Sequence, residues 1–398
     1  MNFAVSLLGS LLGFFMKNLS IIIFYSVIVV LILLFKNRFT VESKFILLYK
    51  TKLGISLMNF LSKKYRSFFR VLGYSGIGFG FVGMLFILFF LIKSSFSIFF
   101  KPSVEQSVSL VLPGTSIPGV GTLNFPFWII TIFIIAFVHE FGHGVIARTH
   151  NIKVKSSGIV FFGPIIGAFV EPDEKQLEKS SDVVQYSVFA AGPFFNLLLT
   201  FIVVLLLNTA LMPMFYSVSQ PVGVSFSSIT PGFPAANAGL EPGIIISRVN
   251  NVSIKNSDDF SNFMFCTRPN QTLVFESFDN KTFTLITKEN PDFPSKGYIG
   301  VVGIKDEFKP KQGFRAIFNV LSYLIQLFRF LGILSLGIGL FNLLPLGVVD
   351  GGRMLRTFLL SSFKKKKALL LWKRISLCTL IVLLINLVGP FLKRLLLG

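Results

Sequence analysis

The segment Phe137-Val-His-Glu-Phe-Gly-His143 decides both the fold class and the chemistry predicted for this 398-residue chain. In a helix, His139 and His143 lie one turn apart on the same face, so both imidazoles can reach one metal ion. Glu140 then lies beside that ion, where its carboxylate can take a proton from water. The segment lies in an apolar run, and ionisable side chains at membrane depth are functional candidates by default. We therefore expect a zinc hydrolase site inside the bilayer.

The composition excludes an ordinary soluble domain. The chain is 53% hydrophobic and only 14% charged, with a mean hydropathy of +0.73. Its net charge of +20 is not the mark of a nucleic-acid-binding protein, because the basic residues lie in short loops beside apolar runs. The sequence therefore predicts a multi-pass protein of the cell membrane, in contact with the lipid bilayer and without a nucleic acid partner.

Six apolar runs are long enough to cross about 30 Å of hydrocarbon, which takes about 20 helical residues. They lie at about 18–35, 71–92, 125–147, 184–210, 329–349 and 375–392. The first sixteen residues are also apolar, and they either extend the first span or lie at the membrane interface. The pattern predicts about six transmembrane helices.

The charges of the loops predict the orientation of these helices. Residues 36–70 carry nine Lys/Arg against Glu42 alone, and residues 351–374 carry eight basic residues and no acid. By the positive-inside rule both segments are cytoplasmic, and the loop 94–124 is outside. The third span then runs inward and places His139 about 13 Å before its cytoplasmic end at Arg148. The site is therefore expected on the cytoplasmic side.

Two segments depart from the spanning pattern. Residues 151–182 alternate glycine, proline and aromatic residues and predict a hairpin that dips into the membrane beside the metal helix. Residues 218–304 show short alternating runs separated by turn pairs such as Asn250-Asn251, which predict a small β-rich domain outside the membrane. The expected domain boundaries are 1–93, 94–210, 218–304, 313–360 and 361–398.

The candidate for a third metal ligand is Asp350. It follows the segment Asn342-Leu-Leu-Pro-Leu-Gly-Val-Val349 and is expected to close the fifth span at its cytoplasmic end. Pro345 and Gly347 interrupt that helix and can turn the carboxylate inward. The alternative is that Asp350 marks a loop turn before Gly351-Gly352. A catalytic zinc site normally takes three protein ligands, which favours the first interpretation.

Three further polar residues have open roles. His150 follows the end of the metal helix and is expected to be exposed at the interface. Asn196, in Gly192-Pro-Phe-Phe-Asn196, either hydrogen-bonds a substrate backbone or oxyanion, or bridges helices as buried amides commonly do. Asn342 has the same two interpretations.

These motifs together resemble those of the site-2 protease family of intramembrane zinc metalloproteases. The chain carries His139-Glu-Phe-Gly-His143, then Gly192-xxx-Asn196, then Asn342-xx-Pro-xxxx-Asp350-Gly, in the order and on the alternating spans of that family. The segment from Pro231 to Asn251 resembles a PDZ module, with Ile244 where such domains usually place an aspartate. The resemblance covers roughly residues 40–360.

The resemblance implies one zinc ion bound by His139, His143 and Asp350, with Glu140 as general base and Asn196 or Asn342 assisting. The substrates implied are single-span membrane proteins cut within or near their membrane segment, in signalling or in clearance of signal-peptide remnants. A helix hides its carbonyls in hydrogen bonds, so such a substrate must unwind first. The hairpin at 157–170 is expected to pair with it by strand addition. The PDZ-like domain either captures or filters substrate ends outside the membrane, or is a steric cap that binds nothing.

Three alternatives compete with this interpretation. Prenyl-protein-type and heat-shock membrane proteases also use HExxH, but they take the third ligand from a downstream helical glutamate, and no glutamate after Glu140 lies in an apolar run. A non-catalytic membrane scaffold would bind partners through the PDZ-like domain and keep a vestigial metal motif, yet Glu140 is retained. A transporter fits poorly because the sequence has no repeated halves.

Overall fold

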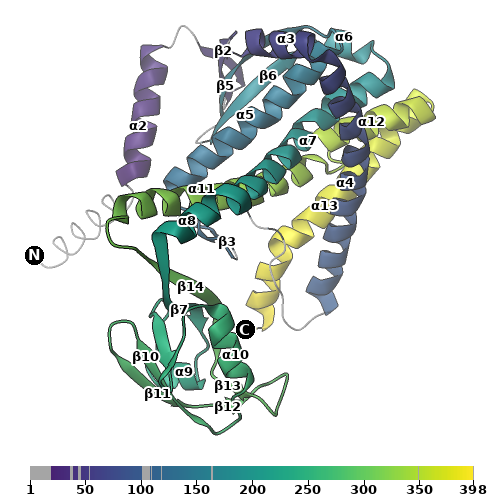
Figure 1. Ribbon diagram of the computed structural model, residues 1–398. Helices are drawn as coiled ribbons and strands as arrows, with labels where there is room; N and C mark the ends of the chain where they lie inside the picture. The colour runs from purple at the N-terminus through teal and green to yellow at the C-terminus, as the bar shows by residue number, and fades with distance from the viewer. Residues whose placement is uncertain are drawn as a thin grey trace, which may run out of the picture. The chain divides into compact units, whose positions relative to one another are not determined.

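The computed structural model describes residues 19–35, 39–43, 46–52, 54–100, 108, 110–117, 119–162, 165–347 and 349–397. The chain divides into two compact units (Figure 1). Unit 1 comprises Met1–Leu205 and Leu327–Gly398, and unit 2 comprises Leu206–Gln326. Several expected features lie outside the described residues: the apolar first sixteen residues, the basic residues Lys36, Arg38 and Lys44, and the charged pair Lys101 and Glu105.

Five helical stretches in the described part of the chain are long and apolar enough to cross a membrane. They are α4 (Arg66–Phe100), α5 (Phe125–Thr149), the continuous stretch Asp182–Val218, α11 (Arg315–Asn342) and α13 (Lys365–Leu397). The stretch Asp182–Val218 contains α7 (Asp182–Leu206), the π-helical turn η2 (Leu207–Leu211) and α8 (Met212–Val218). Helix α2 (Leu19–Leu34) has 16 residues, fewer than the roughly 20 that a span needs, so the sixth span stays a prediction.

Unit 1 contains a four-stranded antiparallel sheet in the order β1-β2-β5-β6. The hairpin of β5 (Val154–Phe162) and β6 (Ile165–Pro172) falls where the sequence predicted one. Strands β1 (Phe39–Ser43) and β2 (Ile46–Thr51) extend it, with Tyr49 opposite Ile159. The charges of residues 36–70 predict one basic loop, but this segment contains two short apolar strands and the helix α3 (Ile55–Lys64). β6 is left as an edge strand.

Helix α5 is positioned by its first turn and by close packing of its last turns. The Asn124 side chain caps it by accepting a hydrogen bond from the Phe127 N–H at 3.0 Å. At the other end Val145, Ile146 and Ala147 are fully buried in a cluster that includes Met58 of α3. Helix α5 runs beside strand β6 (Figure 1). The metal motif therefore lies on the best-packed part of unit 1.

Polar side chains join α7 to α11 inside unit 1. The Ser335 hydroxyl donates to the carbonyl oxygen of Asn196 at 2.8 Å, and the Thr200 hydroxyl donates to that of Gly332 at 3.2 Å. Hydrogen bonds of this kind hold membrane helices together where apolar packing alone is weak. They fix the helix that carries Asn196 against the helix that leads to Asp350.

The fifth span ends earlier than the sequence predicted. Helix α11 stops at Asn342, before Pro345, and a new helix α12 (Asp350–Ser362) begins at Asp350 itself. The reason is the proline, which has no N–H to continue a helix. Asp350 therefore opens a helix and does not close the span.

Unit 2 contains a small β domain with its own core, and the expected domain 218–304 lies within the unit. Its main sheet has the order β11-β10-β8-β7-β14, with β9 paired to β8. Val224, Phe226, Phe275 and Ile246 form its buried centre with Phe260 of α10. Its elements are β7 (Ser219–Ile229), α9 (Pro234–Asn237), β8 (Ile246–Val249), β9 (Val252–Ser253), α10 (Ser257–Phe265), β10 (Thr272–Ser277), β11 (Thr282–Ile286), β12 (Lys288–Glu289), β13 (Gly297–Tyr298) and β14 (Val301–Pro310).

Candidate metal centre

The two histidines of α5 converge at their Nε2 atoms. One helical turn separates them, and the distance between His139 Nε2 and His143 Nε2 is 3.2 Å. Asp350 Oδ2 lies 3.1 Å from the first nitrogen and 3.4 Å from the second. The three ligand atoms therefore form a compact cluster that can hold one ion.

Two glycines after Asp350 allow the chain to bring its carboxylate to the histidines. A Cβ at Gly351 would overlap the carbonyl group of Leu343, and a Cβ at Gly352 would overlap that of Leu346. The loop 343–349 therefore packs against the first turn of α12 at a distance that only glycine permits. Asp350 thus opens α12 where the alternative interpretation placed it in a loop turn, and the two glycines permit the approach of its carboxylate to the histidines.

The hydrogen bonds of the histidine Nδ1 atoms show whether the Nε2 lone pairs are free to bind a metal ion. His143 Nδ1 lies 2.7 Å from the Val188 carbonyl oxygen, which only accepts, so Nδ1 carries the proton and Nε2 has its lone pair free. His139 Nδ1 lies 3.2 Å from the Asn196 amide. The Asn196 Oδ1 atom is buried and has no hydrogen-bond partner among the described residues. Exchanging the amide oxygen and nitrogen lets Oδ1 accept from Nδ1–H, which also frees the His139 Nε2 lone pair.

Space for an ion at this cluster comes from Gly192. A Cβ on this residue of α7 would overlap the Nε2 atoms of both His139 and His143. A cradle of two imidazole lone pairs and one carboxylate, left open by a glycine, suits the tetrahedral nitrogen and oxygen coordination of zinc. The donor set and its supporting bonds therefore fit a zinc ion.

Comparison with known proteins identifies the family. Residues 127–383 match the model of Peptidase family M50. The chain belongs to peptidase family M50. The predicted family is thereby confirmed, and with its five apolar helices the protein is an integral membrane protein.

Individual relatives agree with this assignment. An uncharacterized protein of Methanocaldococcus jannaschii is 28% identical over 233 residues, 58% of this chain and 56% of the relative. A Rickettsia conorii protein named "Putative zinc metalloprotease" is 26% identical over 195 residues, 40% of this chain and 50% of the relative. A Clostridium acetobutylicum protein with the same descriptive name is 23% identical over 302 residues, 57% of this chain and 85% of the relative. The chain thus spans about half the length of the first two relatives.

Glu140 of this M50 protein borders a cavity that contains the metal cluster. The cavity has a volume of about 340 Å³, and its walls include both histidines, Asp350 and Asn342. The Glu140 Oε2 atom accepts a hydrogen bond from the Val170 N–H of β6 at 2.9 Å. The edge strand thus fixes the carboxylate beside the candidate metal ligands, and no sequence motif indicated this role of Val170.

Asn196 and Asn342 have different surroundings in the structure. Asn196 is fully buried, and its amide contacts His139, so its place favours the bridging interpretation over contact with substrate. Asn342 lies at the end of α11, lines the metal cavity and donates from Nδ2 to the Ile338 carbonyl oxygen at 3.0 Å. Asn342 therefore borders the metal cavity, whereas Asn196 is not among its lining residues.

His150 is half-buried, contrary to the exposed position that was expected. Its Nε2 atom lies 3.2 Å from the Ser187 hydroxyl, and its ring lies beside that of Tyr74. Burial lowers the pKa of His150, and the charges of Arg70 and Arg66 lower it further. The residue caps α5 in its neutral form and lies apart from the metal cluster.

Two charged residues of the cavity wall carry no motif and were not predicted. Arg353, one turn after Asp350, forms an ion pair with Glu174 of α6 (Glu174–Glu178) at 3.3 Å. Both line the metal cavity, and the Arg353 guanidinium lies over the Phe189 ring at 4.4 Å. The only indication in the sequence was position: Arg353 follows the candidate ligand Asp350 by three residues, and Glu174 follows the β5–β6 hairpin.

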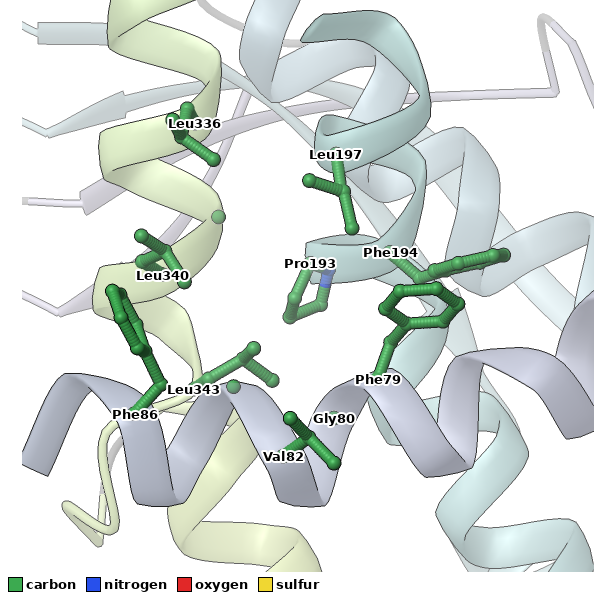
Figure 2. A pocket seen from close by; sticks show the side chains of 12 residues that line it. Phe79, Gly80, Val82, Phe86, Pro193, Phe194, Leu197, Leu336, Leu340 and Leu343 are labelled. Carbon is green, nitrogen blue, oxygen red and sulfur yellow. The ribbon is translucent and has the colours of Figure 1, made fainter. Parts of the chain in front are cut away.

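A second pocket, entirely apolar, lies between α4, α7 and α11 (Figure 2). It has a volume of about 200 Å³, and Pro193 forms part of its wall, directly after Gly192. It contains no group that could take part in hydrolysis.

Proposed function

We propose that the protein is a zinc endopeptidase that hydrolyses peptide bonds within or near the membrane segment of single-span membrane proteins. The observation that supports it most is the convergence of Asp350 on His139 and His143, which lie with Glu140 on α5, a helix long enough to cross a membrane. Family membership and the names of the relatives point to the same class of enzyme.

Each residue of the proposed active site has a separate role in the hydrolysis. Bound zinc supplies Lewis acidity and lowers the pKa of water to about 7. Glu140 takes the proton from that water and later delivers it to the leaving amine. Asn196 orients His139, and Asn342 offers a hydrogen bond to the substrate backbone.

Strand β6 is the proposed platform for the substrate. As the edge of the sheet it has one side without a neighbouring strand, and that side faces Glu140 through the Val170 N–H. An unwound substrate segment can add there by backbone hydrogen bonds. Proline substitutions along β6 are expected to reduce cleavage, and unchanged cleavage in all of them would count against strand addition.

The orientation and the accessory domain follow from charge and position in the chain. We place the metal centre toward the cytoplasm, since the run Lys364–Lys367 lies directly after α12, which begins with Asp350. The β domain within unit 2, which resembles a PDZ module, is then outside, where it binds or filters substrate ends. The competing proposal is a scaffold in which that domain binds partners and the metal site is inert.

Zinc content decides between enzyme and scaffold. Purified wild-type protein is expected to hold about one zinc per chain, and Asp350→Ala to lose most of it. Glu241→Ala removes an exposed carboxylate of unit 2 and serves as the matched control. Glu140→Gln is expected to keep zinc and to lose cleavage of a single-span substrate. Absence of zinc in metal-replete wild type would support the scaffold.

A further inference from the structure

A large apolar pocket lies on the other side of Glu140 from the metal cluster. It has a volume of about 390 Å³ and lies between α3, α5 and strands β2, β5 and β6. Its walls include Met58, Phe133, Phe137 and Ala168, and we refer to it as the Phe137 pocket. Among its described lining residues, Glu140 is the only charged side chain.

The pocket and the metal cavity meet at three residues. Glu140, Phe169 and Val170 line both spaces. On α5, Phe133, Phe137 and Glu140 follow helical spacing along one face, while His139 and His143 occupy the neighbouring face. Glu140 is therefore at the border between an apolar space and the ligand cluster.

We propose that the Phe137 pocket binds the side chain of one bulky apolar substrate residue next to the scissile bond. The inference rests on the proposed function, and it adds a specificity determinant to it. Continuity with the metal cavity argues for substrate as the occupant, because a peptide that reaches Glu140 has its next side chain beside this pocket. A volume of about 390 Å³ accommodates an aromatic or branched aliphatic side chain.

The geometry of an extended strand restricts the preference for a large apolar residue to one side of the scissile bond. Side chains of an extended peptide alternate between opposite faces, so the two residues that flank the scissile bond point in opposite directions. Only one of them can enter the Phe137 pocket from a position along β6. The enzyme should therefore select a large apolar residue at one flank and tolerate small residues at the other.

Ala168 is the position at which to fill the pocket. It lies on β6, two residues before Val170, and so shares its face. Ala168→Phe places an aromatic ring in the space, whereas Phe133→Ala enlarges it. Val71→Phe places an aromatic ring on an exposed position of α4, which lines neither the Phe137 pocket nor the metal cavity, and is the control.

The probe is a model single-span peptide with flanking lysines and an Asn-Gly pair at mid-span, in which each neighbouring position is varied among Ala, Leu, Phe and Trp. Wild type should show kcat/KM about 10–100-fold higher for Leu or Phe than for Ala at one position only, in line with the discrimination of apolar pockets. Ala168→Phe should remove this preference and retain cleavage of the Ala peptide. Phe133→Ala should raise the relative rate for Trp, and Val71→Phe should change neither the preference nor the relative rate for Trp. If the Ala168→Phe protein loses zinc, the relative rate of the Phe133→Ala protein for the Trp peptide is the result that tests the pocket assignment.

Cleavage without a one-sided preference, or an equal loss for all peptides in Ala168→Phe, would overturn the pocket assignment and leave the peptidase proposal intact. A second measurement does not depend on turnover: binding of the same peptides to zinc-loaded Glu140→Gln protein. There the Leu peptide should bind at least about 10-fold more tightly than the Ala peptide, and added Ala168→Phe should remove the difference. If wild type cleaves no peptide, the peptidase proposal fails, and this binding comparison decides the pocket.

Discussion

At the scale of single residues, Gly192 sets the size of the metal centre. Its missing side chain leaves the space that the Nε2 atoms of His139 and His143 share. Gly192→Ala is expected to lower zinc occupancy at least about tenfold, because the added methyl group and the ion compete for one position. Gly337→Ala is the matched control, since a Cβ there meets no atom within 4 Å. Metal analysis of both purified proteins checks the prediction, and full zinc in Gly192→Ala would contradict it.

Substitution of Asn196 should weaken zinc binding, whereas substitution of Asn342 should reduce catalysis. Asn196→Ala removes the partner of His139 Nδ1, and loss of such a supporting group typically costs about 10–100-fold in metal affinity. Asn342→Ala leaves the ligands and their partners in place, so zinc affinity should stay within about twofold while kcat/KM falls. Competition with a zinc chelator measures the first effect, and peptide cleavage measures the second. Equal zinc affinity in both variants would mean that Asn196 does not orient the ligand.

At the scale of elements, α4 packs through small residues. A Cβ at Gly80 would meet Met354 Cε at 2.7 Å and Ala190 Cβ at 3.2 Å, whereas one at Gly78 meets nothing within 4 Å. Close helix approach through glycine is a common basis of membrane helix packing. Gly80→Leu is expected to destabilise the protein by about 1–3 kcal/mol through overpacking, and Gly78→Leu to have little effect. Thermal unfolding in detergent measures both, and equal melting temperatures would contradict this packing.

The long apolar elements could be predicted from the sequence, and the short ones could not. Helix α5 begins at Phe125, as predicted, because a stretch of about 20 apolar residues has a length fixed by the bilayer. Strands β1 and β2 were missed because five or six residues give little periodicity, and basic residues nearby suggested a loop. The end of α11 was misplaced because the apolar run continues through Pro345 after the helix has stopped.

In the candidate site too, part of the arrangement could be predicted from the sequence and part could not. Spacing within one helix determines that His139 and His143 face each other, so the sequence alone could predict the pair. Val170 and Gly192 are apolar or lack a side chain, and their roles arise only from which backbone comes near Glu140 and the histidines. Contacts between distant segments carry no local signal, and they supply the supporting half of this site.

At the scale of the whole molecule, unit 2 is separable from the metal centre along the chain. All three candidate ligands and Glu140 belong to unit 1. The first and last strands of the domain, β7 and β14, pair antiparallel, with Ser219 opposite Pro310, so the two ends of the domain are neighbouring strand residues about 5 Å apart. A linker of a few glycines can therefore replace residues 220–309. The shortened protein is expected to keep its zinc and its cleavage of the model peptide.

What the deletion should change is the choice of substrate. If unit 2 filters substrate ends, the shortened protein cleaves single-span substrates with large external domains at least about tenfold faster relative to short ones, as expected when a step of selective binding is removed. Competition between a long and a short substrate in the same vesicles measures this ratio directly, with the full chain as the control. An unchanged ratio would assign unit 2 a role other than filtering. Loss of zinc on deletion would mean that the two units depend on each other, in spite of their separate cores.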